Sequence, residues 1–183
     1  MLVVVALVSF IIGLLFSSYC RLYLALCCIT DSWSLLVGHA IKKREALISL
    51  CRLSANPVVR SQYLDRLLQE EQFLKNCISL KKRNFLKQAR EAVPTFHEME
   101  AEFLNRTKNL YSLLELALGE SFSQKQFKEL SENFWAADNL FSFETTVFEQ
   151  AVEKYEDLRT KPTLQLAKEV FRFSSVPEVK FNR

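Results

Sequence analysis

The chain has few residues of the types that make turns. Its 183 residues include only three Gly and four Pro, whereas average proteins contain about 7% Gly and about 5% Pro. This scarcity argues against an all-β sandwich or barrel, against a doubly wound α/β fold with Gly-rich loops, and against a disordered chain. Apolar residues make up 49% of the chain and aromatic residues 12%. We therefore expect an all-α protein with ample material for a core.

Histidine is also scarce, and the residue sets that carry chemistry are missing. His39 and His97 lie far apart in the sequence, and no second His follows His97 at the spacing of a zinc protease. The glycines are isolated, so no phosphate-binding loop exists, and no Ser or Cys stands in a nucleophile-elbow motif. The sequence predicts no catalytic residue, no cofactor and no metal site, and we expect a protein that is not an enzyme.

The five cysteines show no spacing typical of a disulfide framework or a zinc site. Cys20, Cys27 and Cys28 lie in or beside an apolar N-terminal segment, and Cys51 and Cys77 lie on apolar helical stretches. We interpret them as free thiols that behave as small hydrophobes, which fits a reducing cytoplasm.

Charge is absent from the first 20 residues, and Arg21 is the only charged residue among the first 29. As a helix, the run from Leu2 to Cys20 would span ~28 Å, enough to cross the hydrocarbon core of a bilayer. A cleavable signal peptide is the alternative, but no Lys or Arg precedes the run. We predict a retained membrane anchor over residues 1–29. Its membrane-facing residues include Leu2, Phe10, Ile11, Ile12, Leu14, Leu15, Phe16 and Tyr19.

Positive charge follows the anchor rather than preceding it. Arg21 comes first, and the triplet Lys42-Lys43-Arg44 follows, so the positive-inside rule places the C-terminal domain in the cytoplasm. These four residues are candidates for contact with anionic lipid headgroups, although a solvated helix face is the commoner role of a basic triplet. The net charge is +3, and the chain after residue 29 is nearly neutral, so nucleic acid is not an expected partner.

Apolar residues spaced three and four apart predict long helices after the anchor. Asn56-Pro57 is typical of a helix start, and Pro94 is expected to kink or end the helix that follows. Asp31-Ser32-Trp33 leaves open whether the first helix breaks there or runs straight through. Residues 96–117 carry a further apolar stripe.

The longest apolar stripe predicts a helix that packs on a partner along its whole length. Gly119 and a Ser123–Gln126 capping box precede this helix, and Pro162 ends it. The stripe consists of Phe127, Leu130, Phe134, Ala137, Phe141, Glu144, Phe148, Ala151, Tyr155 and Leu158. We predict an antiparallel bundle of three or four helices over residues 30–160, followed by a short helix and a docking tail over 161–183.

Two charged residues occupy apolar stripes on different helices. Arg106 interrupts the stripe of residues 96–117, and Glu144 interrupts the longest stripe. Each could reach water at the rim of the bundle, or the two could pair and fix the helix register.

The order of several short motifs gives a further indication. Near the N-terminus stand Tyr19, Trp33-Ser34 and Lys42-Lys43, and later come Glu132-Asn133-Phe134, Glu144, Tyr155 and Phe171-Arg172-Phe173. In order and spacing this resembles the bacterial LemA family over nearly the whole chain. The sequence departs from the family pattern at Cys20, where Asn is usual, and at Arg172, where Gly is usual.

The resemblance implies an antiparallel four-helix bundle tethered to the bacterial inner membrane by one helix. It implies no enzymatic activity and supplies no catalytic residues. Trp33 is expected to seat the first bundle helix, and Glu132, Asn133 and Phe134 to set the packing of the last long helix. The other family-like structural positions are Glu144, Tyr155, Phe171 and Phe173.

Two functions remain open. The first is a scaffold that recruits another protein or a second copy of itself at the membrane. The second is a ligand- or stress-sensing bundle on the outer side of the membrane.

Overall fold

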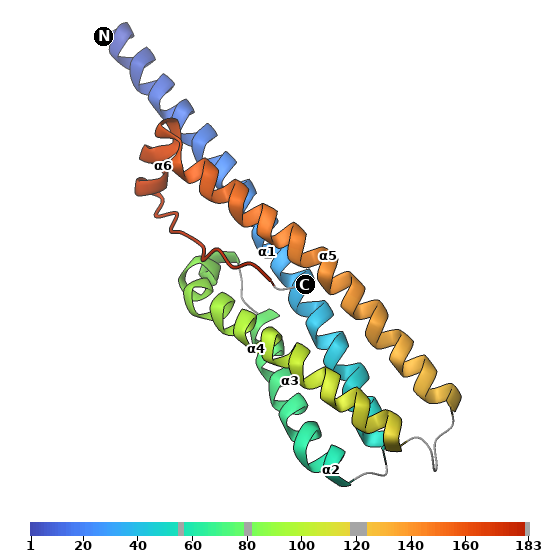
Figure 1. Cartoon of the computed structure of the whole chain (residues 1–183). Coiled ribbons are helices and arrows are strands. Elements are labelled where there is room, and N and C mark those ends of the chain that lie inside the picture. Colours follow the sequence, from blue (N-terminus) through green and yellow to red (C-terminus); the bar gives the residue numbers. More distant parts are fainter. Residues whose placement is uncertain (55–56, 79–81, 118–123, 182–183) are drawn as a thin grey trace.

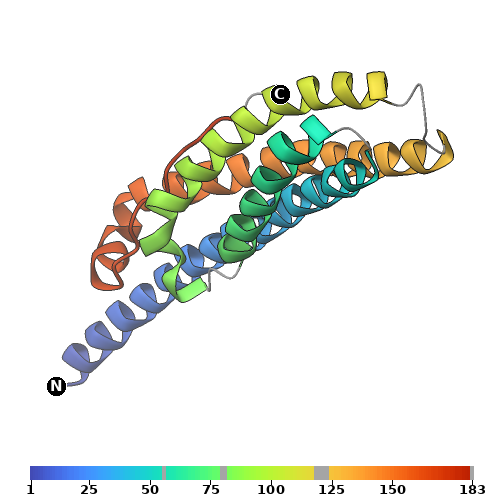
Figure 2. The same ribbon diagram turned by 90° about the horizontal axis from the view of Figure 1, so that it is seen from below.

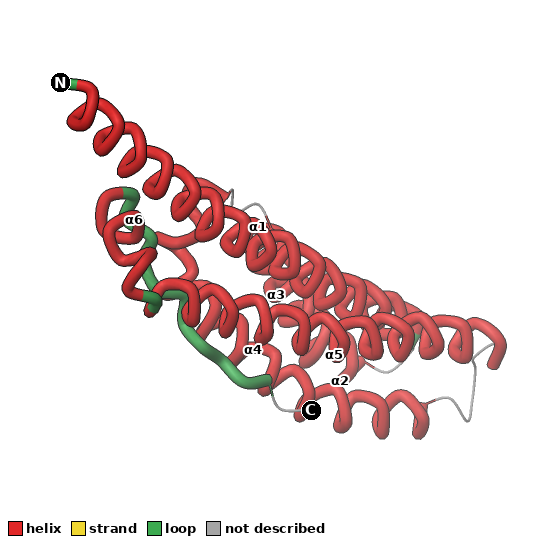
Figure 3. Tube along the Cα trace, turned by 90° about the horizontal axis from the view of Figure 1, so that it is seen from above, coloured by secondary structure: helices red, strands yellow, loops and turns green. Residues whose placement is uncertain are grey.

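The computed structural model describes residues 1–54, 57–78, 82–117 and 124–181. Within these ranges the chain is helical except for an extended C-terminal stretch, and no strand occurs (Figure 3), which confirms the all-α prediction. The helices are α1 (Leu2–Leu53), α2 (Pro57–Val59), the π-helical turn η1 (Arg60–Leu64), α3 (Asp65–Ile78), α4 (Lys82–Ala117), α5 (Gln124–Thr160), the 3₁₀ turn η2 (Pro162–Leu164) and α6 (Gln165–Val170).

Helix α1 runs without a break from the N-terminus to Leu53. Its 52 residues extend over ~78 Å. The polar residues at the suspected break bond to the carbonyls of their own helix: Thr30 Oγ1 donates to Cys27 O at 2.9 Å, and Ser32 Oγ donates to Ile29 O at 3.1 Å. These side chains therefore do not cap a new helix, and the anchor and the bundle share one continuous element.

The long helices form an antiparallel bundle (Figures 1 and 2). Helix α5 lies antiparallel to α1 and packs on it most closely, and α3 packs on another side of α1. Helix α4 runs back alongside α3 (Figure 1), and apolar side chains from α1, α3, α4 and α5 form one core. This confirms the predicted helical bundle.

Pro162 follows the end of a helix, whereas Pro94 lies inside one. Before Pro162, Lys161 adopts an extended backbone (φ −66°, ψ 126°), because the proline ring crowds a helical conformation of the preceding residue. This ends α5 as predicted. Pro94, by contrast, lies inside α4, and the helix continues through it.

The sequence predicts one continuous helix from Pro57 to about Val93, just before Pro94, and this prediction is wrong. Helix α3 ends at Ile78, and α4 begins at Lys82 and runs in the opposite direction (Figure 1). The sequence from 58 to 93 contains neither Gly nor Pro, so the usual signals of a chain reversal are missing. The predicted caps at Asn56, Gly119 and Ser123 lie outside the described residues.

Trp33 is the centre of an aromatic core. Its ring is 1% exposed and lies 6.1 Å from Phe85 and 5.1 Å from Phe96 of α4, and 5.5 Å from Phe148 of α5, measured between ring centroids. Its Nε1–H donates to Cys77 O of α3 at 3.3 Å. One side chain of α1 thus contacts α3, α4 and α5.

The C-terminal stretch docks back on the bundle as an extended chain (Figure 3). Tyr155 Oη donates to Ser174 O at 2.9 Å, and the Val176 N–H donates to Glu156 Oε1 at 2.9 Å. Farther on, the Phe181 N–H donates to Glu149 Oε1 at 2.8 Å. Phe181 is buried, with its ring 5.8 Å from that of Phe96. Side chains of α5 therefore satisfy backbone groups that a short terminal segment could not pair by itself.

Helix α1 is long and apolar enough to cross a membrane. Residues 1–14 are all exposed, and Leu15 is the first to pack, in part, against the rest of the chain. Of the predicted anchor residues, Leu15 and Tyr19 are partly buried and the others are exposed. Leu22 is the first residue of α1 with no exposed surface. It lies inside the range predicted for the anchor.

Candidate functional site

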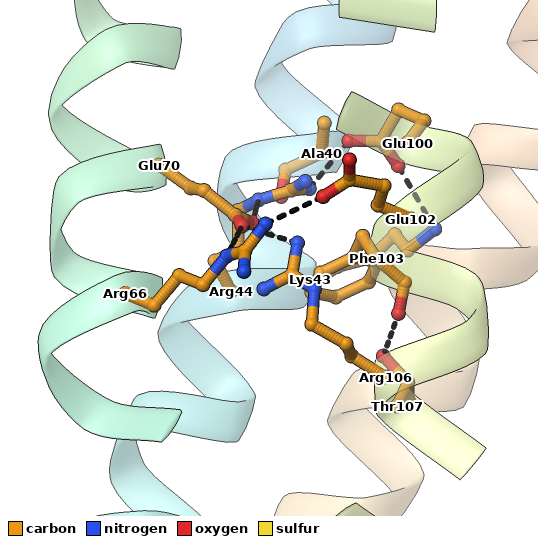
Figure 4. A network of polar contacts seen from close by, with 10 residues as sticks. All are labelled: Ala40, Lys43, Arg44, Arg66, Glu70, Glu100, Glu102, Phe103, Arg106 and Thr107. Carbon is orange, nitrogen blue, oxygen red and sulfur yellow. Dashed lines mark hydrogen bonds and ion pairs between the residues drawn. The ribbon is translucent and has the colours of Figure 1, made fainter. Parts of the chain in front are cut away.

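Charged side chains from four helices meet inside the bundle, and Figure 4 shows those of α1, α3 and α4. Helix α1 contributes Lys43 and Arg44, α3 contributes Glu70, α4 contributes Glu100, and α5 contributes Asp138. We call these five residues the ionic network. Long charged residues are almost never fully buried unless they are paired, so this cluster is the most unusual feature of the interior.

Arg44 lies at the centre of the ionic network, and its side chain has no exposed surface. Its Nε donates to Glu70 Oε2 at 3.2 Å, and its Nη1 lies 2.5 Å from Glu100 Oε1 and donates to Ala40 O at 3.2 Å. The guanidinium carbon lies 4.0 Å from the centroid of the Phe103 ring, a cation–π arrangement. Arg44 therefore ties α1 to both α3 and α4.

Lys43 extends the ionic network to α5. Its side chain is 4% exposed, and its Nζ lies 2.7 Å from Asp138 Oδ1 and 3.5 Å from Glu100 Oε2. The ammonium also lies 4.1 Å from the centroid of the Phe141 ring. Lys43 and Arg44, adjacent in sequence, thus bridge three separate helices to α1.

Two arginines at the rim complete the charge balance. Arg106 of α4, 22% exposed, pairs with Glu70 Oε1. Arg66 of α3, 53% exposed, lies 3.6 Å from the same oxygen and 2.5 Å from Glu102 Oε2. Every carboxylate in this region faces a cation, so the arrangement neutralises charge. Such a cluster gives the bundle a specific register at a cost in desolvation.

Two hollows adjoin the ionic network between α4 and α5. Lys43 and Asp138 line both. One, of about 280 Å³, is also lined by His97, Glu100 and Phe181. The other, of about 380 Å³, is mainly aromatic and is lined by Phe103, Tyr111, Phe134 and Trp135. The Lys43–Asp138 ion pair therefore lies between the two hollows.

The aromatic hollow continues onto an exposed surface. Trp135 is 53% exposed, and its ring stacks 5.7 Å from that of Tyr111. Phe143 and Leu140 on the same helix are also exposed. Burial raises the pKa of the Tyr111 phenol to about 12, so this hydroxyl stays protonated at neutral pH. We call Leu104 and Trp135, which line this hollow and are exposed, the α4–α5 surface.

The structure corrects the lipid-contact prediction. Lys43 and Arg44 are buried in ion pairs and cannot reach lipid. Lys42 is exposed, but it lies roughly 30 Å beyond Arg21 along the unbroken helix. Arg21, exposed at the base of the anchor, is the one of the four that still fits a headgroup contact.

Arg106 and Glu144 do not pair, which decides the question that the sequence left open. Arg106 pairs with Glu70 instead. Glu144 Oε2 and His39 Nδ1 are both buried without a hydrogen-bond partner among the described residues. Burial lowers the pKa of His39, and the nearby Lys42 lowers it further, whereas Glu144 opposes the shift.

The family-like positions divide into two groups. Trp33, Phe134, Tyr155 and Phe173 are buried, as structural positions should be. Glu132 and Asn133 are exposed on α5, and Glu132 makes only a surface ion pair with Lys128, so their expected packing role is wrong. Phe171 is 46% exposed, although its ring lies 4.7 Å from that of Tyr19.

A signal for the ionic network was present in the sequence. Arg44 continues a spacing of three and four residues along α1, and every member of this stripe is buried. The stripe consists of Trp33, Val37, Ala40, Arg44, Leu47 and Cys51. Glu100 and Glu70 interrupt buried stripes on α4 and α3 in the same way, so charges inside apolar stripes on three helices would have indicated mutual pairing.

No protein-family model, no curated protein and no solved structure matches this chain. The resemblance to the LemA family therefore stays a prediction. Among the described residues, no group of three or more His, Cys, Asp or Glu side chains gathers as metal ligands would.

Proposed function

We propose that the chain is a non-enzymatic, single-pass membrane protein of the LemA type, a scaffold at the bacterial inner membrane whose bundle lies in the cytoplasm. The observation that carries this proposal is the exposed apolar segment of α1, residues 2–14, which continues without interruption into the buried bundle. Exposed apolar surface on this scale needs a bilayer or a partner to cover it.

The scaffold role draws support from the α4–α5 surface. Leu104 and Trp135 are 39% and 53% exposed, and large aromatic side chains are common anchors of protein interfaces. The ionic network beneath this surface holds α1, α3, α4 and α5 in one register, so the surface has a rigid support. The partner is another protein or a second copy of the chain.

The alternative is a ligand- or stress-sensing bundle outside the cytoplasm. The two hollows beside Lys43 and Asp138 favour it, since each is large enough for a small molecule. The charge distribution favours the first orientation, because Arg21, Lys161, Lys168 and Arg172 lie on the bundle side of the anchor.

Topology separates the two functions. We would fuse to Arg183 either a reporter active only in the cytoplasm or one active only outside it. We expect signal from the cytoplasmic reporter. Signal from the external reporter alone would overturn the orientation and favour the sensor. If neither reporter fusion is found in the membrane fraction and the full-length chain is in the soluble fraction, membrane anchoring itself is contradicted.

A further inference from the structure

Helix α6 lies where α1 leaves the bundle (Figures 1 and 2). From Leu2 to Tyr19 the helix rises ~26 Å, close to the thickness of the hydrocarbon core. Tyr19 contacts the chain just after α6: its ring lies 4.7 Å from that of Phe171 and 5.8 Å from that of Phe173. Helix α6 therefore lies at the level at which the anchor would pass from hydrocarbon to headgroups.

Apolar side chains in and beside α6 lie on two sides, one buried against the bundle and one exposed. Leu164 and Ala167 are 2% and 1% exposed and face the bundle. Leu166, Val170 and Phe171 are 56%, 58% and 46% exposed. Leu166 and Val170 are four residues apart, so they share one face of the helix.

Aromatic and basic residues occur near this exposed face in the chain or in space. Tyr19 stacks on Tyr23 at 5.7 Å, and Tyr23 is 41% exposed. Tyr is enriched at membrane–water interfaces, where its ring lies at headgroup depth. Residues 161–173 contain three basic residues, Lys161, Lys168 and Arg172, and a single acidic one, Glu169. The element thus combines apolar side chains with positive charge, as interfacial helices do.

Arg172 occupies a position that does not suit its backbone. Its φ is +55°, and its N–H donates to Glu169 O at 3.3 Å while that of Phe173 donates to Lys168 O at 3.0 Å. This is the Schellman ending of a helix, in which Gly is the usual residue at the left-handed position. Arg adds a charge there at the expense of backbone strain.

We infer that α6 and Phe171 form an interfacial foot, which inserts Leu166, Val170 and Phe171 at the boundary of headgroups and acyl chains and contacts anionic phospholipids through Lys168 and Arg172. The foot rests on the proposed function, because it uses the bilayer that α1 crosses. The foot extends the exposed apolar surface of the anchor to the end of the bundle beside it. It gives the bundle a second contact with the membrane, in addition to α1.

The test uses the full chain in vesicles of phosphatidylcholine and phosphatidylglycerol, with Cys20, Cys27 and Cys28 replaced by Ser. An environment-sensitive fluorophore is attached at Leu166→Cys, at Glu132→Cys on the exposed far part of α5, or at Ser9→Cys in the anchor. Nitroxides on the lipids, placed near the headgroup or deep in the chain, report contact with the bilayer. We expect the shallow nitroxide to quench the label at 166 and the deep one to quench the label at 9, with neither quenching the label at 132.

The outcomes separate the foot from the anchor. If the label at 9 is quenched and that at 166 is not, the foot is wrong and the anchor stands. If the label at 9 is not quenched, membrane anchoring fails and the foot fails with it. The label at 166 can also be compared between vesicles that hold many copies of the chain and nanodiscs that hold one. If it is protected from water only in the vesicles, a second copy covers α6, and the foot is wrong.

Arg172→Gly tests the charge separately from the fold. The substitution removes one basic residue, worth ~1 kcal/mol near an anionic surface, and relieves the left-handed backbone. We expect about fivefold weaker association of the foot with anionic vesicles, no change on pure phosphatidylcholine, and an unfolding temperature that does not fall. Unchanged quenching on anionic vesicles would overturn the part of the inference that assigns lipid contact to Arg172.

Discussion

Arg44 is a fully buried cation between two carboxylates from different helices. Its removal would leave Glu70 and Glu100 in the interior with only Lys43 and the rim arginines near them. Breaking a buried ion pair on one side is strongly destabilising, because the remaining charge stays desolvated.

We expect Arg44→Ala to lower the free energy of unfolding by ~3–5 kcal/mol, measured by helical circular dichroism during denaturation of the detergent-solubilised full chain. The control is Arg66→Ala, whose side chain is 53% exposed and which should cost less than about 1 kcal/mol. Equal losses for the two variants would contradict a central role for Arg44.

His39 gives the fold a pH dependence of defined sign. Burial and Lys42 hold the pKa of His39 in the folded chain below its ordinary value of 6.5. The unfolded chain therefore binds more protons in this range, and stability falls as the pH decreases through 6.5.

The difference in unfolding stability between the wild type and His39→Gln separates the contribution of His39 from that of the carboxylates. We expect the wild type to lose more stability than His39→Gln between pH 7.5 and pH 5.5, about one unit on either side of the ordinary histidine pKa, in thermal unfolding. Parallel curves for the two proteins would show that His39 does not titrate differently on folding.

For single residues, the sequence indicated which charged side chains interrupt apolar stripes but not which of them pair. Arg106 and Glu144 were recognised as charges in apolar stripes, yet Arg106 pairs with Glu70 on a helix whose boundary was misplaced. Lys43 and Arg44 look like a solvated triplet because basic residues are normally exposed. Only the helix register places Arg44 on the buried side.

At the scale of elements, the extended C-terminal stretch depends on side chains of α5 and on Phe181. We expect Phe181→Ala to expose the rings of Phe96 and Phe141 and to weaken tail docking by ~3 kcal/mol. Hydrogen exchange at the amides of Val176 and residue 181, which donate to Glu156 and Glu149, should accelerate markedly.

The matched control for the tail is Phe171→Ala. Phe171 is 46% exposed, so this variant should leave both amides protected in detergent. If Phe171→Ala accelerated exchange as much as Phe181→Ala, docking of the tail would depend on the whole stretch rather than on the buried ring.

Helices with a continuous apolar stripe could be predicted from the sequence. The chain reversal between α3 and α4, which has no Gly or Pro, could not. The stripe from Phe127 to Leu158 defines α5, and Pro162 marks its end, because a proline constrains the residue before it. The reversal between α3 and α4 follows from packing alone, since both helices bury faces against α1. Local sequence carries no sign of that tertiary choice.

For the whole molecule, the continuity of α1 sets the height of the bundle above the bilayer that we propose it crosses. Arg52, near the end of α1, is exposed and lies ~45 Å beyond Arg21 along the helix. Cys28, also exposed, lies only ~10 Å beyond it. A rigid helix keeps these two heights different, whereas a hinge would let the bundle fold down onto the membrane.

Energy transfer to acceptor lipids measures these heights. Donor dyes on Arg52→Cys or on native Cys28, in chains whose other N-terminal cysteines are Ser, should show weak and strong transfer respectively. Burial raises the pKa of the Cys51 and Cys77 thiols to about 11, so both should stay unlabelled at neutral pH. Similar transfer from both positions would rule out an upright bundle.

The pairing of α1 with α5 also fixes an order of events during synthesis. Helix α5 begins about 70 residues after α1 ends, so at ~5–20 residues per second its synthesis finishes roughly 5–20 s later. Helices form within about a microsecond, and in that interval the bundle-facing stripe of α1 has no α5 to cover it. The bilayer is available to the N-terminal half from the start. If α1 crosses a bilayer as we propose, the nascent chain is held at the membrane before its bundle closes, and α5 completes the fold.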